Sequence, residues 1–148
     1  MSAVLVDANV LVYAADRLAG ARHHAARHLL ACLDHTNAAV SSQVLSEYAN
    51  VLTHPRKLAR EAPTVARSVR EVAVRFRVIP VTAETVLEAV DARARWQLAY
   101  YDAQIWAAAA LAGVPVVLSE DFADGLVLGP VRFVNPFAEG FVLAEVLM

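Results

Sequence analysis

The stretch Ala3-Val4-Leu5-Val6-Asp7 decides the fold, because it is an apolar run that ends abruptly in a carboxylate. A strand this apolar is typical of the centre of a parallel sheet that is covered on both faces. Asp7 would then lie at the carboxyl edge of the sheet, where ligands bind in open α/β folds. The sequence therefore predicts an α/β domain with a binding crevice at this edge.

The composition predicts a single domain that does not bind nucleic acid through its overall charge. A chain of 148 residues is long enough to bury a core without disulfides or metals. Its hydrophobic content of 58% is high against a charged content of 19%, which favours burial of some surface by a partner subunit. The net charge of −2 means that any contact with nucleic acid must be local.

No stretch of the chain has the pattern of a signal peptide or a membrane span. The first apolar run carries no preceding basic residue and is cut short by Asp7. The other long apolar stretch, 105–118, is interrupted by Gly113 and Pro115 and is too short to cross a bilayer core of ~30 Å. Cys32 is the only cysteine, which fits a reducing compartment. We expect a soluble cytoplasmic protein with no membrane contact.

Short apolar runs alternate with longer segments of helical periodicity, as in a sheet built from right-handed β-α units. Ser41 or Ser42 and Thr82 are suitable N-caps for two of the helices. Strands are expected at 3–7, 38–40, 77–81, 114–118 and 131–134, and helices at 9–15, 20–33, 42–54, 82–96 and 98–112.

Four acidic residues stand where the predicted elements would bring them to one edge. Asp7 and Asp121 follow predicted strands, and Glu47 flanks the apolar arc of its helix. Asp102 shares an apolar row of an alanine-rich helix, where a lone ionised group costs several kcal/mol unless it is paired, protonated or coordinated. Taken alone, Glu47 could equally be a solvated residue at the edge of an ordinary amphipathic helix.

If these carboxylates converge, they must either hold protons through raised pKa values or capture a hard divalent cation. Oxygen ligands select Mg²⁺ or Mn²⁺ over zinc. A magnesium site of this kind suits phosphodiester hydrolysis, in which the metal lowers the pKa of the attacking water and neutralises charge on the phosphate.

Two other features have a functional and a structural interpretation. His24 and His28 are one helical turn apart and could chelate a metal, but a solvated pair is expected because no cysteine or carboxylate stands at a matching offset. The stretch 56–77 holds more than half of the basic residues, and it could contact phosphates or form the solvated face of a helix.

The order of these motifs resembles a PIN domain, and is most similar to the VapC-like toxin ribonucleases of bacterial toxin–antitoxin pairs. The resemblance extends from Val4 to Phe137, so we expect a PIN-like domain over 1–137 and an apolar tail over 138–148 that packs on the domain or on a second subunit. The segments that carry it are 6–14, 46–48, 101–105, 118–122 and 135–137.

The resemblance implies a three-layer α/β/α fold and an endoribonuclease that depends on Mg²⁺ or Mn²⁺. It also implies a homodimer and a small antitoxin protein that blocks the site. Ala8 departs from the Thr or Ser that is frequent in relatives, and Glu120 and Asp124 are additional acids that leave the fourth ligand open. Residue by residue, the resemblance assigns catalysis and metal binding to Asp7, Glu47, Asp102 and Asp121, orientation of the first carboxylate to Asn9, and the hydroxyl two residues before the last Asp to Ser119, with Arg56, Lys57 and Arg60 as guesses for RNA contact.

Two other functions remain as alternatives. The chain could be a catalytically silent PIN-like module that binds RNA or protein, although a pure binding module gains nothing from clustered acids. It could also be a phosphatase with an aspartyl nucleophile. That alternative is weaker, because Asn9 stands where such enzymes place a second Asp and Lys57 is in the wrong region to bind phosphate.

Overall fold

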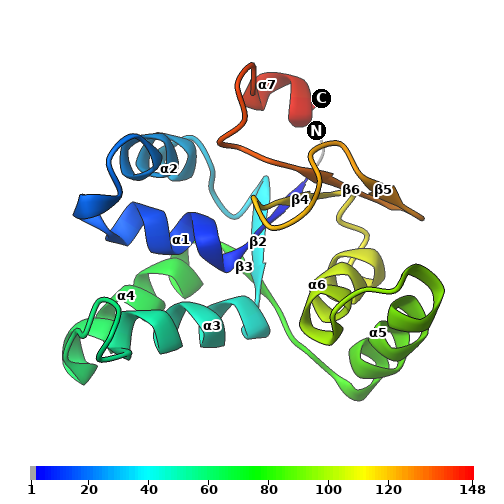
Figure 1. The fold of residues 1–148 in the computed structure, drawn as a ribbon, viewed down its shortest axis with the longest axis horizontal. Coiled ribbons are helices and arrows are strands. Elements are labelled where there is room, and N and C mark those ends of the chain that lie inside the picture. The colour runs from blue at the N-terminus through cyan, green and yellow to red at the C-terminus, as the bar shows by residue number, and fades with distance from the viewer. Residues whose placement is uncertain (1–2) are drawn as a thin grey trace.

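The computed structural model describes residues 3–148 as a six-stranded sheet with helices on both faces (Figure 1). The strand order is β3-β2-β1-β4-β6-β5, and all neighbours are parallel except β5 and β6. The central position of β1 agrees with its apolar sequence, because every residue of that strand is buried. The strands are β1 (Val4–Val6), β2 (Ala38–Ser41), β3 (Arg77–Ile79), β4 (Val116–Leu118), β5 (Val127–Leu128) and β6 (Val131–Val134).

The helices form two layers, which confirms the predicted three-layer α/β/α fold. The chain moves outward from β1 through β2 to β3 and then returns to β4, so right-handed connections place the helices before and after β3 on opposite faces. Figure 1 shows α1 to α4 on one side and α5 and α6 on the other. The helices are α1 (Ala8–Ala15), the 3₁₀ helix η1 (Arg17–Ala19), α2 (Ala21–Ala31), α3 (Ser42–Thr53), α4 (Ala62–Arg75), α5 (Ala83–Trp96), α6 (Tyr100–Leu111) and α7 (Leu143–Val146).

Capping side chains start three of these helices close to the ends of strands. The carboxylate of Asp7 accepts a hydrogen bond from the backbone N–H of Ala8 at 2.7 Å, so α1 begins directly after β1. The hydroxyl of Ser41 caps α3, and Thr82 caps α5, as predicted. Strand ends and the first turns of helices therefore meet along one edge of the sheet.

The buried face of α2 agrees only in part with the face that the helical spacing of Ala25, Leu29, Leu30 and Leu33 predicts, since Leu29 and Leu33 are buried but Ala25 is exposed. His23 lies on the buried face as well: it is 6% exposed, and its Nδ1 lies 2.9 Å from the carbonyl oxygen of Tyr13. A buried imidazole requires a hydrogen-bond partner, and the end of α1 supplies one. Because His23 is polar, an apolar pattern could not place it on the buried face of α2.

The C-terminal tail folds back onto the domain. Val146 is buried, and Phe141, Leu143 and Leu147 pack against the core. The short strand β5 and the helices α4 and α7 were not among the predicted elements. The boundary at residue 137 between a nuclease domain and a separate tail stays a prediction. None of the helices described for residues 3–148 has the length and hydropathy of a membrane span.

Candidate active site

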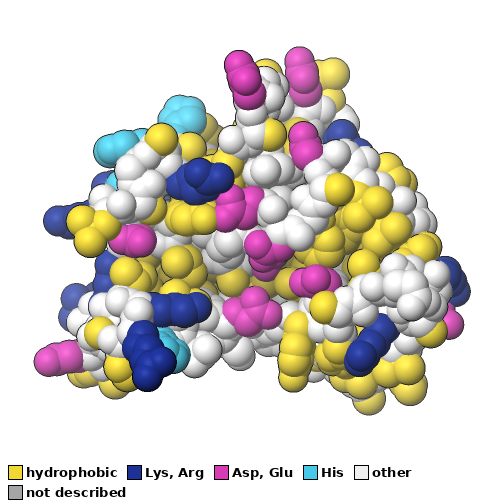
Figure 2. Space-filling view, viewed as in Figure 1, with side chains coloured by type: hydrophobic (Ala, Val, Ile, Leu, Met, Phe, Trp, Pro, Cys, Tyr) yellow, Lys and Arg dark blue, Asp and Glu magenta, His cyan; other side chains and the backbone are white. Residues whose placement is uncertain are grey.

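Four predicted carboxylates meet at the carboxyl edge of the sheet. Asp7 follows β1 and Asp121 follows β4, while Glu47 lies in α3 and Asp102 in the first turn of α6. The charges of Glu47 and Asp121 both act on Asp7, and the charge of Asp121 also acts on Asp102. Figure 2 shows acidic side chains gathered in the middle of this face, between the two groups of helices. The fold therefore brings these residues, far apart in the chain, into one electrostatic environment.

Asn9 and Ser119 connect the two carboxylates that follow strands. The hydroxyl of Ser119 donates to Asp7 Oδ2 at 2.7 Å, and it accepts from Asn9 Nδ2 at 3.0 Å and from the backbone N–H of Asp121 at 3.1 Å. Asn9 Nδ2 lies 3.2 Å from Asp121 Oδ2 and 3.4 Å from Asp7 Oδ2. One amide and one hydroxyl thus determine the separation and orientation of Asp7 and Asp121.

Asp7 is a carboxylate that the fold keeps out of water. It is 2% exposed, and burial raises its pKa from 3.8 to about 6. Hydrogen bonds from Ser119 and Ala8 lower this pKa, and the charges of Glu47 and Asp121 raise it, but burial is the largest effect. Burial also raises the pKa of Asp102, and Asp121 adds to that increase.

A chain of amide side chains positions Glu47. Gln43 Nε2 donates to Glu47 Oε1 at 2.7 Å and to the carbonyl oxygen of Tyr101 at 3.0 Å. Gln104 Nε2 donates to Gln43 Oε1 at 2.7 Å, and the hydroxyl of Tyr100 donates to Gln104 Oε1 at 3.0 Å. These bonds tie α3 to α6 beside the carboxylates that the two helices carry.

The sequence interpretation missed both glutamines. Gln43 and Gln104 are 8% and 7% exposed. A signal was present, since Gln104 and Asp102 are the charged or amide side chains of an alanine-rich helix and a buried amide needs partners. The spacing of Gln43 one turn before Glu47 was the second signal.

The additional acids of the last motif have partners of their own. Glu120 accepts hydrogen bonds from the hydroxyl of Tyr13 and from Arg22 Nε, the latter at 3.0 Å. The bond to Glu120 is also the main reason that the pKa of Tyr13 is raised. Asp124 accepts from the backbone N–H of Asn135 at 2.9 Å. Both acids are thus engaged outside the group formed by the four predicted carboxylates.

A cavity of about 620 Å³ opens beside the carboxylates. Of the three predicted RNA contacts, Lys57 lines it. Arg60 instead donates to the carbonyl oxygen of Ala15, and Arg56 is exposed. The acidic and polar walls of this cavity include Asn9, Tyr13, Glu47, Glu120 and Asp121.

The donor atoms around this cavity suit a hard divalent cation. The ion pairs within residues 3–148 are Arg22–Glu120 and Arg95–Asp91, so no basic side chain described there neutralises the four predicted carboxylates. Carboxylate oxygens are the ligands that Mg²⁺ and Mn²⁺ prefer. In the same part of the chain, no three His, Cys, Asp or Glu side chains are already arranged as a metal site.

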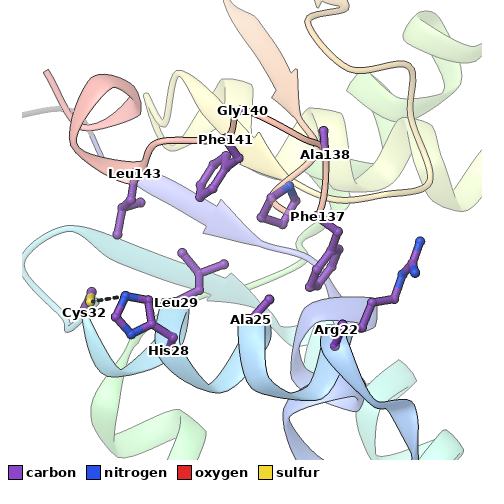
Figure 3. Close-up of a pocket in the computed structure, with 12 residues that line it drawn as sticks. Arg22, Ala25, His28, Leu29, Cys32, Phe137, Ala138, Gly140, Phe141 and Leu143 are labelled. Atoms are coloured by element: carbon purple, nitrogen blue, oxygen red, sulfur yellow. Dashed lines mark hydrogen bonds between the residues drawn. The ribbon is translucent and has the colours of Figure 1, made fainter.

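A second cavity, of about 490 Å³, lies between α2 and the tail and contains a residue pair that the sequence interpretation overlooked (Figure 3). Cys32 stands one helical turn after His28, as His28 does after His24, so the expectation that no cysteine lies at a matching offset was wrong. Cys32 Sγ lies 4.0 Å from His28 Nε2, while Phe137 and Phe141 line the same cavity. Two exposed ligands on one helix do not make a metal site.

Comparison with known proteins identifies the fold family. No curated protein sequence matches the chain. Among solved structures, VapC20 of Mycobacterium tuberculosis, a Sarcin-Ricin loop cleaving toxin, is 24% identical with a TM-score of 0.65, over 80% of this chain and 90% of that chain. A toxin–antitoxin complex from Klebsiella pneumoniae is 21% identical with a TM-score of 0.63, over 91% and 98% of the two chains.

FitAcB from Neisseria gonorrhoeae is 18% identical with a TM-score of 0.65, over 90% of this chain and 98% of that chain. At these identities the likeness establishes the fold. The family model of the PIN domain matches residues 4–123, which include all four predicted carboxylates. The chain therefore belongs to the PIN domain family, as its motifs predicted.

Proposed function

We propose that this protein is an endoribonuclease that depends on a divalent metal ion and acts as the toxin of a toxin–antitoxin pair. The observation that carries the proposal is the group formed by Asp7, Glu47, Asp102 and Asp121. These carboxyl groups act on one another electrostatically while the described part of the chain offers them no basic partner. A divalent cation would relieve that repulsion.

In the proposed site, Asp7, Glu47 and Asp102 hold the principal Mg²⁺ or Mn²⁺ ion, and Asp121 holds it through water or helps to hold a second ion. Such an ion, when bound, supplies activation of a water molecule and neutralisation of charge on the phosphate. Asn9 and Ser119 keep Asp7 and Asp121 in place through their hydrogen bonds. Gln43 does the same for Glu47.

Lys57 is the strongest of the three candidates for RNA contact, because it lines the cavity that contains Glu47 and Asp121. A single lysine can hold a phosphate without reading sequence. Arg56 and Arg60 are weaker candidates, since Arg60 is bonded to the carbonyl oxygen of Ala15.

The structural relatives support the proposed partners. VapC20 is described as a toxin that cleaves the Sarcin-Ricin loop, and the Klebsiella relative as a toxin–antitoxin complex. We extend this to a cytoplasmic RNA substrate, a small antitoxin protein and a homodimer for the present chain.

RNA cleavage in Mg²⁺ and in Mn²⁺, with and without EDTA, tests the proposal. We expect Asp7→Asn and Asp102→Asn to abolish cleavage while the purified variants stay folded. Glu139→Gln is a matched control, because Glu139 is an exposed acid of the tail. Unchanged activity in either aspartate variant removes that residue from the site, and activity that survives EDTA contradicts metal dependence. Binding of RNA without cleavage in every metal would favour the catalytically silent alternative.

A further inference from the structure

An exposed aromatic ring stands beside the carboxylates at the start of α6. Tyr101 directly precedes Asp102 in the first turn of that helix and is 65% exposed. Within residues 3–148, its hydroxyl group forms no hydrogen bond. A tyrosine ring offers a large apolar area with few rotatable bonds, and such rings are frequent where proteins bind partners. The position of Tyr101 next to the proposed metal site indicates a contact with the substrate of that site.

Neighbouring side chains hold Tyr101 in place before any partner binds. Its carbonyl oxygen accepts a hydrogen bond from Gln43 Nε2 at 3.0 Å. Its ring makes an edge contact with the ring of Tyr100, with the centroids 5.2 Å apart and the planes at 81°. The hydroxyl of Tyr100 in turn donates to Gln104 Oε1 at 3.0 Å. A partner that stacks on Tyr101 therefore meets a ring whose motion is already restricted, which lowers the entropic cost of binding.

Tyr101 lines a cavity of about 280 Å³ between the beginnings of α3 and α6, and we call it the Tyr101 cavity. The side chains of its wall are uncharged, in contrast to the acidic cleft beside it. An uncharged cavity with one aromatic wall suits a flat heterocycle better than an ion. The other residues that line it are Ser42, Gln43, Ser46, Val81 and Gln104.

Two serine hydroxyls give the Tyr101 cavity a donor and an acceptor. The oxygen of Ser42 accepts from the backbone N–H of Val81 at 2.9 Å, which leaves the hydroxyl proton of Ser42 to donate. The hydroxyl of Ser46 donates to the carbonyl oxygen of Ser42 at 3.1 Å, which leaves the oxygen of Ser46 to accept. A nucleobase combines a flat face for stacking with donors and acceptors on its edge. The chemistry of the cavity therefore matches a nucleobase.

One side chain connects the Tyr101 cavity to the carboxylates. Gln43 lines the cavity, and its Nε2 donates to Glu47 Oε1 at 2.7 Å. Glu47 also lines the larger cavity of about 620 Å³. Figure 2 shows apolar side chains directly beside the acidic ones on this face. A strand of RNA with a phosphate at the carboxylates can therefore place a neighbouring base against Tyr101.

We propose that the Tyr101 cavity binds an unpaired nucleobase of the RNA, next to the phosphate that is cleaved. The base stacks on the ring of Tyr101, and its edge meets the hydroxyls of Ser42 and Ser46. This inference rests on the proposed ribonuclease function and adds the class of substrate, which is RNA that is single-stranded at the cleavage position. A base inside a duplex is not free to stack on a side chain, whereas every unpaired base has a face that can.

Binding of a short RNA to the full chain tests the base site without requiring cleavage. The probe is a fluorescein-labelled single-stranded RNA of about twelve nucleotides, followed by fluorescence anisotropy with Ca²⁺ in place of Mg²⁺. We expect Tyr101→Ala to raise the dissociation constant about tenfold, and Tyr101→Phe to leave it within about twofold because the ring remains. Leu111→Ala is the matched control, since Leu111 is 43% exposed at the other end of α6.

Two further RNAs distinguish stacking on a base from a contact with the backbone. An oligonucleotide of the same length with abasic ribose at every position keeps the phosphates and loses the bases. A duplex of the same sequence keeps the bases but pairs them. Tyr101→Ala should leave the dissociation constants of both unchanged. A tenfold loss for the abasic RNA as well would mean that Tyr101 acts on the backbone or on the fold, which overturns the base site.

Different failures overturn different proposals. Unchanged affinity of Tyr101→Ala for the single-stranded RNA overturns the base site, even if the variant binds a protein partner or a second copy less tightly. A wild-type chain that binds this RNA through Tyr101 but cleaves no RNA in Mg²⁺ or Mn²⁺ overturns the ribonuclease function and supports the base site. A wild-type chain that binds no RNA overturns both.

Discussion

The two halves of the acidic cleft hold their carboxylates in different ways. In the strand half, Asp7 and Asp121 are joined by the short polar side chains of Asn9 and Ser119, and Asp7 is almost completely buried. In the helix half, Glu47 is held by Gln43, and Asp102 is only half-buried. Burial therefore dominates the protonation of Asp7 in the strand half, whereas a chain of amides between α3 and α6 positions Glu47 in the helix half.

The largest expected effect is that of Asp7→Asn on the free energy of unfolding, and it distinguishes the buried strand half of the cleft from the helix half. Its pKa of about 6 in the folded protein lies above the ordinary value of 3.8, so the folded state binds the extra proton and stability falls as pH rises through that window. Above the pKa of the folded state, the ionised carboxylate of Asp7 lowers the free energy of unfolding by about 3 kcal/mol. We expect Asp7→Asn to raise the free energy of unfolding by up to this amount at pH 8, and by about 1 kcal/mol at pH 4.5.

Urea unfolding at the two pH values measures this difference. Glu139→Gln, which removes an exposed acid, should show no comparable gain. An equal gain for Asp7→Asn at both pH values would mean that the substitution does not act through ionisation of Asp7. The distinction between a buried strand half and a more open helix half would then lose its main support.

In the helix half, stability and activity should instead depend on the amide side chains of Gln43 and Gln104. Gln104→Leu removes the donor to Gln43 Oε1 and leaves a buried amide unpaired, which costs about 1–3 kcal/mol of unfolding free energy. Tyr100→Phe removes only the outer end of the chain and should cost less. Urea unfolding of both variants measures the costs, and RNA cleavage should fall further in Gln104→Leu because Glu47 loses its support. Equal losses in the two variants would contradict the expectation that the bond from Gln104 to Gln43 supports Glu47 more than the outer bond from Tyr100 does.

A third comparison uses the metal as a probe of the strand half. The proton on Asp7 competes with a cation, so the apparent affinity for Mg²⁺ should fall about tenfold for each pH unit below the pKa of Asp7. The rise of the thermal midpoint with added Mg²⁺ reports that affinity, since a ligand specific to the native state stabilises it. Asp7→Asn should remove this pH dependence. A midpoint shift that is the same at pH 5 and pH 8 would place the ion away from Asp7.

The strand half was predictable from the sequence, and the helix half only in part. An apolar run that ends in a carboxylate places Asp7 and Asp121 at the same edge of a parallel sheet, because strand ends follow directly from the pattern. Glu47 and Asp102 needed the packing of α3 beside α6. The amides that link them, Gln43 and Gln104, are 61 residues apart. No local pattern contains that pairing.

Short elements and side-chain directions escaped prediction for a similar reason. The strand β5 has two residues, and it exists because β6 offers a free edge. Glu120 and Asp121 are adjacent acids, and the sequence pattern does not distinguish their roles. Only the fold shows that Glu120 is engaged by Tyr13 and by Arg22, which is 98 residues away.

The smallest expected effect tests that last distinction. Because Glu120 is occupied by Tyr13 and Arg22, we expect Glu120→Gln to change the rate of RNA cleavage by less than about threefold, or about 0.7 kcal/mol in the barrier. Asp121→Asn should reduce cleavage much more. The same Glu120→Gln change should lower the pKa of Tyr13, because the bond to the charged Glu120 is the main cause of its raised value. An absorbance titration of tyrosine, with Tyr13→Phe as the reference, measures that shift. A large loss of cleavage with an unchanged tyrosine titration would instead place Glu120 among the carboxylates of the active site.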